Sequence, residues 1–269
     1  MIPLYDNVPA ERSPFVTVGL IVINAAVFLF LVTMPDGERM SLLFQYGFIP
    51  GRIFSPARVQ QFYLANFHHF QFVPPAQYSI IDGLFPAFTS MFLHGGWLHI
   101  IGNMWILWIF GNNVEDRLGH VFFLLFYIVC GLTSAVVHTL SAPTSPVVTV
   151  GASGAIAGVM GAYLLLYPRA WVFTIIPIFI ILYPAWVPAF VFLIVWFAIQ
   201  IFSGAISMTN GDVLAGGIAW WAHVGGFVAG AVFVLLTGMH GDREYRTRNH
   251  RRAYSVFGHP QRSRPDDEW

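Results

Sequence analysis

The chain has little charge, no lysine and a single cysteine. Of its 269 residues, 10% are Asp, Glu, Lys or Arg, against about 25% in soluble domains, and 57% are hydrophobic. Thirteen acidic residues balance thirteen arginines, so no net positive field attracts nucleic-acid phosphates. Cys130 stands alone, which excludes an internal disulfide and a multi-cysteine metal site. This composition excludes a disordered chain, disfavours an ordinary soluble enzyme and favours an integral membrane protein.

Apolar segments long enough to cross a bilayer recur along the chain, and a spanning helix needs about 20 such residues. We expect an all-α polytopic membrane protein, a bundle of six transmembrane helices at 14–34, 91–110, 121–140, 152–167, 187–203 and 218–236. Prolines interrupt the apolar run 170–204, which predicts a short structured connection before the fifth span. Residues 1–13 form a polar N-terminal segment, 14–238 the membrane domain and 239–269 a charged tail.

A polar and aromatic insert, about 35–85, follows the first span. It is too polar to cross the membrane, and its many Phe and Tyr residues predict a position at the lipid interface. We expect further loops at 141–150 and 205–217. Because the glycines of the 205–217 loop permit hinge-like motion, this loop and the fifth span are candidate gates to the site.

The distribution of arginine predicts the orientation. With six spans both termini lie on one side, and that side collects ten of the thirteen arginines. Cytoplasmic loops carry the excess of positive residues, so both termini are expected in the cytoplasm and the protein in the cytoplasmic membrane.

Polar residues inside the apolar spans are the informative feature, because an intramembrane ionisable group is costly and points to function. Three groups occur, on the second, fourth and sixth spans: His94, His99 and Asn103; Gly151 to Gly154 with Ser153; and His223 with Gly225 and Gly226. His99 and Asn103 are four residues apart and share a helix face.

The predicted topology brings these groups together. The fourth and sixth spans both begin at the outer face, so Ser153 and His223 lie at similar depth. Gly154 with Gly158, and Gly226 with Gly230, form small-residue faces that allow two backbones to approach closely. Imidazole can take the proton of a serine hydroxyl, and donors on the second span can hold a developing oxyanion.

Each group alone has an ordinary structural interpretation: a serine among glycines packs, and a lone intramembrane histidine bonds between helices. Three histidines also suit a metal, but no His-Glu-x-x-His occurs and no carboxylate lies within a predicted span. A zinc site is therefore poorly supported, and no metal or cofactor is expected.

In combination, His94-x4-His99-x3-Asn103, then Gly-Ala-Ser153-Gly, then Ala-His223-Val-Gly-Gly resembles the rhomboid family of intramembrane serine proteases. The run Glu115 to Gly119 also resembles the family's short loop after the second span. The resemblance covers roughly 14–238 and implies a Ser153–His223 dyad without an acidic third member.

The resemblance further implies an oxyanion hole of His99, Asn103 and the Ser153 backbone N–H, with His94 in a supporting role and transmembrane proteins as substrates. One departure is Ala157, where many relatives have a tyrosine that packs on the catalytic histidine. Two alternatives stay open: a non-catalytic protein of this fold that binds transmembrane helices, and a small transporter or proton relay using the intramembrane histidines. The substrate and the oligomeric state are not predicted.

Overall fold

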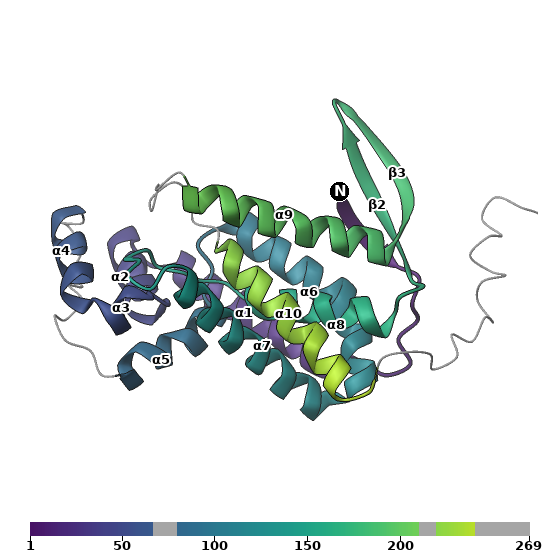
Figure 1. Cartoon of the computed structure of the whole chain (residues 1–269), viewed down its shortest axis with the longest axis horizontal. Coiled ribbons are helices and arrows are strands. Elements are labelled where there is room, and N and C mark those ends of the chain that lie inside the picture. Colours follow the sequence, from purple (N-terminus) through teal and green to yellow (C-terminus); the bar gives the residue numbers. More distant parts are fainter. Residues whose placement is uncertain (67–79, 210–218, 240–269) are drawn as a thin grey trace, which may run out of the picture.

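The computed structural model describes residues 1–66, 80–209 and 219–239. A group of long helices forms a bundle, with a cluster of short helices at one end and a strand hairpin standing out from its side (Figure 1). The bundle helices are α1 (Phe15–Val32), α6 (Trp97–Leu118), α7 (His120–Ser141), α8 (Ser153–Leu166), α9 (Ala189–Thr209) and α10 (Trp220–Leu236).

Within the described residues, α1, α7 and α9 are long and apolar enough to cross a membrane. Helices α8 and α10 are apolar but shorter, and α6 carries several polar residues. The chain is therefore a mostly helical membrane protein, while the count of six crossings stays a prediction.

Helix α8 occupies the centre of the bundle, and most of its residues are buried. Its glycines explain how: a Cβ added to Gly226 would lie 1.9 Å from the Gly154 carbonyl oxygen, and one added to Gly230 would lie 1.8 Å from that of Gly158. Backbones at this separation leave no room for a side chain. The two small-residue faces of the sequence thus form the contact between α8 and α10.

The prediction of an all-α chain was wrong in one respect, because the structure contains a three-stranded antiparallel sheet. Its strands are β1 (Ile2–Asp6), β2 (Trp171–Ile178) and β3 (Ile181–Pro188), in the order β1-β2-β3. The expected connection before the fifth span is the β2–β3 hairpin. The N-terminal segment adds the third strand. This strand could not be predicted from so short a segment, because its β conformation depends on pairing with β2, which is distant in sequence.

The second span was predicted six residues too early, since Ser90–Phe92 is a 3-10 turn and α6 begins only at Trp97, after Gly95 and Gly96. The helix also runs through Glu115 to Leu118, which were expected to be a loop. These polar residues are tolerated in the helix because other elements supply partners for them.

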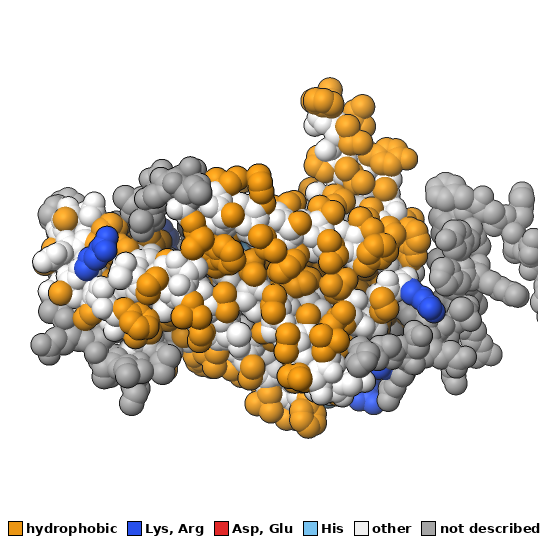
Figure 2. Space-filling view, viewed as in Figure 1, with side chains coloured by type: hydrophobic (Ala, Val, Ile, Leu, Met, Phe, Trp, Pro, Cys, Tyr) orange, Lys and Arg blue, Asp and Glu red, His pale blue; other side chains and the backbone are white. Residues whose placement is uncertain are grey.

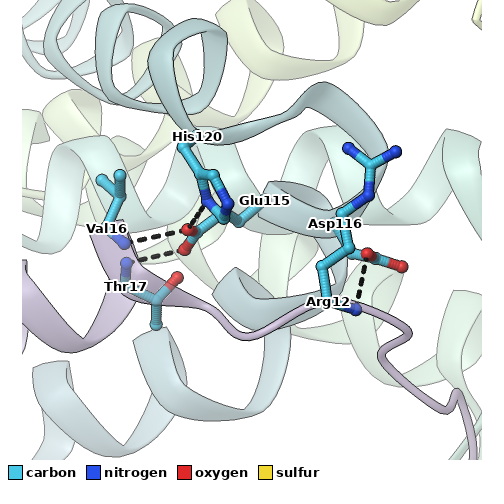
Figure 3. Close-up of polar contacts among 6 residues, drawn as sticks. All are labelled: Arg12, Val16, Thr17, Glu115, Asp116 and His120. Carbon is cyan, nitrogen blue, oxygen red and sulfur yellow. Dashed lines mark hydrogen bonds and ion pairs between the residues drawn. The ribbon is translucent and has the colours of Figure 1, made fainter.

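Figure 3 shows those partners. The buried Glu115 carboxylate accepts hydrogen bonds from the backbone N–H groups of Val16 (2.8 Å) and Thr17 (2.7 Å), and it lies 2.6 Å from His120 Nδ1. A negative charge at the first N–H groups of α1 complements the helix dipole. Neighbouring Asp116 accepts the Arg12 N–H at 3.0 Å. The end of α6 therefore fixes the start of α1.

In its described residues, 35–66 and 80–85, the insert contributes α2 (Asp36–Tyr46), α3 (Gly51–Phe54), α4 (Pro56–Asn66) and the start of α5 (Ile80–Thr89). Arg52 is buried and donates to the carbonyl oxygens of Phe44, Gln45 and Gly47, so a cation caps the C-terminal end of α2. Part of the insert, 67–79, lies outside the described residues, and its position at the lipid interface stays a prediction.

The loop predicted at 205–217 begins later than expected, because α9 continues to Thr209. Its remainder, 210–218, lies outside the described residues, as does the tail from 240 onward.

Candidate active site

Ser153 and His223 lie next to each other, 70 residues apart in sequence. The Ser153 Oγ is 2.8 Å from His223 Nε2. Ser153 is the first residue of α8, and His223 lies in the first turn of α10, one turn before Gly226, where the two backbones touch. The glycine contact therefore sets the separation that a serine–imidazole hydrogen bond requires.

The other nitrogen of the same imidazole meets a residue that the sequence analysis missed. His223 Nδ1 lies 2.8 Å from Oε1 of Gln200, a buried residue of α9. Gln200 Oε1 accepts the Nδ1 proton, which leaves the Nε2 lone pair facing Ser153; this is the tautomer that a general base needs. A lone amide within the apolar run 189–203 was the available signal, by the same criterion that selected His223.

Aromatic rings enclose His223 as well. The Trp196 ring of α9 lies with its centroid 5.9 Å from that of His223, and the Trp220 ring is edge-on at 6.4 Å. These two tryptophans provide the aromatic surroundings that Ala157 cannot. The buried Ala157 instead contributes to the close approach of α8 and α10.

The donors of the second predicted span lie on α6 and face the serine loop. Asn103 is buried, and its Nδ2 lies 2.9 Å from His94 Nε2, so that His94 accepts one of the two amide protons. The rings of His94 and His99 meet edge to face at 5.1 Å. This arrangement fits a supporting role for His94, because its ring orients the Asn103 amide.

Gly151 brings the serine loop against these donors. Its φ is +122°, a conformation that residues with a side chain rarely adopt, and a Cβ there would lie 2.6 Å from His99 Nε2 and 3.5 Å from Asn103 Nδ2. Gly154 is equally constrained, because a Cβ there would overlap the side chain of Ser134. Glycine is therefore required at both positions for steric reasons.

A cavity of about 760 Å³ connects these groups. Its lining includes all four residues assigned to chemistry from the sequence, namely His99, Asn103, Ser153 and His223. It also includes Ser134 and His138 of α7, which the sequence analysis did not single out. The space lies at the N-terminal ends of α8 and α10, and its position toward the outer face of the membrane stays a prediction.

The insert and α7 hold the loop that leads to Ser153. Thr149 pairs with Phe48 through two backbone hydrogen bonds and lies with its Oγ1 3.2 Å from His138 Nε2. Tyr63 donates its hydroxyl proton to the Pro146 carbonyl oxygen at 3.1 Å. The insert thus supports the approach to the serine, a role that its sequence did not suggest.

The donor set does not resemble a metal centre. Among residues 1–66, 80–209 and 219–239, no group of three or more His, Cys, Asp or Glu side chains is arranged to hold a metal ion. Inside the cavity His223 and Ser153 bond to each other, and outside its lining His94 bonds to the Asn103 amide.

Comparison with known proteins confirms the family. The model described as the Rhomboid domain matches residues 82–240, more than half of the chain, so the chain belongs to the rhomboid family. This family includes intramembrane serine proteases, which act on transmembrane substrates within the bilayer.

Individual proteins that are similar to this chain carry rhomboid names. RHOMBOID-like protein 5 of Arabidopsis thaliana is 30% identical over 150 residues, which is 55% of this chain and 43% of that protein. Rhomboid-like protease 5 of Toxoplasma gondii is 30% identical over 158 residues, 57% of this chain and 16% of that protein. Rhomboid protease GluP of Bacillus subtilis (strain 168) is 40% identical over 76 residues, which is 28% of this chain and 14% of that protein. The chain thus spans less than half the length of each of these relatives.

Proposed function

We propose that this protein is an intramembrane serine endopeptidase whose catalytic dyad is Ser153 and His223. The observation that carries the proposal is the 2.8 Å contact between Ser153 Oγ and His223 Nε2, inside a cavity that also contains the Asn103 amide. A serine beside the free nitrogen of an oriented imidazole is the arrangement that nucleophilic catalysis requires.

In the proposed reaction, His223 takes the Ser153 proton as Oγ attacks a peptide carbonyl. The oxyanion that forms is held by His99, by Asn103 and by the Ser153 N–H. That N–H lies in the first turn of α8, where N–H groups have no partner within the helix. His223 then protonates the leaving amine, and water releases the acyl group from Ser153. Gln200 acts as a positioning residue that holds the imidazole in the required tautomer.

The substrate is expected to be a transmembrane helix, cut near its outer end. In lipid a helix has no other partners for its backbone groups, so an extended stretch forms most easily where water is near. Gly or Pro in the substrate should help, since they weaken a helix by about 1 and 3 kcal/mol. By the arginine distribution, the site opens on the outer side of the cytoplasmic membrane, with both termini inside.

The test uses the purified full chain in lipid vesicles with a single-span substrate and mass spectrometry of the cut site. Ser153→Ala and His223→Ala should each abolish cleavage, and the double variant should be no worse, because the two residues act as a unit. Ser41→Ala, at a half-buried serine of α2 outside the cavity lining, is the matched control and should cleave normally. A fluorophosphonate should label the wild type but not Ser153→Ala.

Two other outcomes would overturn the proposal. Substrate that binds but is never cut, with no fluorophosphonate labelling, would favour a non-catalytic helix-binding protein. Proton or solute flux across the vesicle that depends on the intramembrane histidines, without cleavage, would favour a transporter.

A further inference from the structure

The β2–β3 hairpin is an apolar arm that the proposed chemistry does not use. It stands out from the side of the bundle, beyond the start of α9, and its surface is almost wholly hydrophobic (Figures 1 and 2). At its tip Phe179 and Ile180 are 100% and 97% exposed. Soluble surfaces rarely present such a contiguous apolar region, so a partner must cover it.

The tip is built for apolar contact rather than for an easy turn. Pairing of Ile178 with Ile181 leaves a two-residue turn at Phe179 and Ile180. Such turns favour Asn-Gly or Gly-containing pairs, because positive φ is needed. Phe179 nevertheless takes a φ of +53°, an uncommon and strained value for a bulky residue. The chain thus has large apolar side chains where turn preference alone would select small polar ones.

The direction of the hairpin places it in the plane of a membrane. It runs across the direction of α9 rather than along it (Figure 1). If α9 crosses the bilayer, the hairpin extends sideways at the level where α8 ends and α9 begins. With the orientation proposed from the arginine distribution, this level corresponds to the inner boundary between headgroups and acyl chains.

The residues of the hairpin suit that boundary. No charged residue occurs between Arg169 and Asp212, and the exposed Arg169 stands just before β2. Trp171, Tyr183 and Trp186 are at least partly exposed along the hairpin. Tryptophan and tyrosine concentrate at membrane interfaces, and arginine side chains reach out to phosphate.

The edge of the sheet argues against a second protein strand as the partner. β3 is the outer strand, and it contains Pro184 and ends at Pro188. Proline removes a backbone donor and blocks strand addition at an edge. The unpaired backbone groups that remain need water, which the interface supplies and the hydrocarbon centre does not.

The base of the hairpin is fixed to the bundle. Ala189 N–H donates to the Ala170 carbonyl oxygen at 2.8 Å, closing the two ends of the hairpin. The ring of Tyr5 in β1 packs on Phe173 and Trp186, with centroids 5.2 and 5.5 Å apart. β1 in turn is held by the bundle, because Trp105 Nε1 of α6 donates to the Pro3 carbonyl oxygen at 2.6 Å and Tyr163 of α8 donates to Asp6 at 2.7 Å. The hairpin is therefore connected to the bundle through β1.

We propose that the hairpin is an interfacial anchor that lies in the leaflet at the inner ends of α8 and α9, with its tip among the upper acyl carbons. This surface makes one side of the bundle wider at that level and fixes the depth and tilt of α9. The inference concerns lipid contact and is independent of whether Ser153 is catalytic.

The experiment measures the depth of the tip in the full-length protein. A Cys130→Ala background carries Ile180→Cys, or Leu182→Cys as a second site, labelled with NBD in phosphatidylcholine–phosphatidylglycerol vesicles. Lipids with a doxyl group at acyl carbon 5 should quench both probes more than lipids with the group at carbon 12, and aqueous iodide should quench them weakly. Ala10→Cys, in the exposed polar N-terminal segment, is the matched control and should show several-fold stronger iodide quenching.

Two results would overturn the proposal. Iodide quenching at residue 180 equal to that at residue 10, without quenching by doxyl lipids, would place the hairpin in water, available to a soluble protein. Self-quenching that disappears on dilution with unlabelled protein would show that a second copy, not lipid, covers the tip.

Discussion

Replacement of Gln200 by leucine tests the most specific feature of the site. Gln200 Oε1 accepts the His223 Nδ1 proton at 2.8 Å in a buried position. Leucine has nearly the same volume but no acceptor. The imidazole is then left with an unpaired buried N–H, or it moves its proton to Nε2, where it cannot act as a base toward Ser153.

The size of the effect follows from that choice. An unsatisfied buried donor costs about 1–3 kcal/mol, which corresponds to a fall of roughly 5- to 150-fold in kcat at about 1.36 kcal/mol per tenfold. KM should change little, because Gln200 is not expected to touch the substrate. Gln200→Glu retains an acceptor oxygen and should restore most of the rate.

The assay is steady-state cleavage of a single-span substrate in vesicles, with thermal unfolding of each variant measured in parallel. Phe197→Ala is the matched control, because it removes the ring stacked on Phe227 at 4.4 Å and loosens α9 against α10 without touching His223. A Gln200→Leu enzyme with wild-type kcat would refute the positioning role. A loss equal to that of Phe197→Ala, unrelieved by Gln200→Glu, would show that only packing matters.

Three further predictions concern other parts of the molecule. Asn103→Ala should lower kcat by about 10²–10³-fold, since one oxyanion donor is worth about 2.7–4 kcal/mol; cleavage kinetics measure it. Gly230→Ala should destabilise the bundle by about 1–3 kcal/mol or more in thermal unfolding, because its Cβ would overlap the Gly158 carbonyl. Burial raises the pKa of Asp6 to about 6, against the opposing hydrogen bonds from Tyr163, Val8 and Asn113. As the pH rises from about 4 to 6, the unfolded chain has already lost this proton while the folded state still holds it. The free energy of unfolding should therefore fall as the pH rises through this range and stay constant above it, and Asp6→Asn should remove this dependence.

Each of these has a result that contradicts it. An unchanged rate in Asn103→Ala would show that Asn103 only packs. A wild-type melting temperature for Gly230→Ala would show that α8 and α10 can move apart without loss of stability. For Asp6, an identical pH dependence in Asp6→Asn would assign the slope to another group.

Local sequence already contained much of the site. Ser153, His223, His99 and Asn103 were selected because polar groups inside apolar spans are costly, and helical spacing with alternating topology placed them near one face. The glycine spacings 154/158 and 226/230 predicted which helices approach closely, and they form the α8–α10 contact. The structure brings these residues together, because both inferences depend on residue type and short-range periodicity, while the catalytic roles stay predictions.

Only the tertiary structure decided the rest. From the sequence Glu115 was predicted to lie in a loop, and the structure shows that the N-terminus of α1 supplies its hydrogen-bond donors. Residues 1–13 were predicted to be a polar N-terminal segment, and the structure shows that β2 pairs with part of it as β1. Gln200 is one polar residue in an apolar helix until α9 packs against α10 and turns its amide toward His223. In each case the partner is distant in sequence, so the free energy that selects the conformation does not exist until the chain has folded.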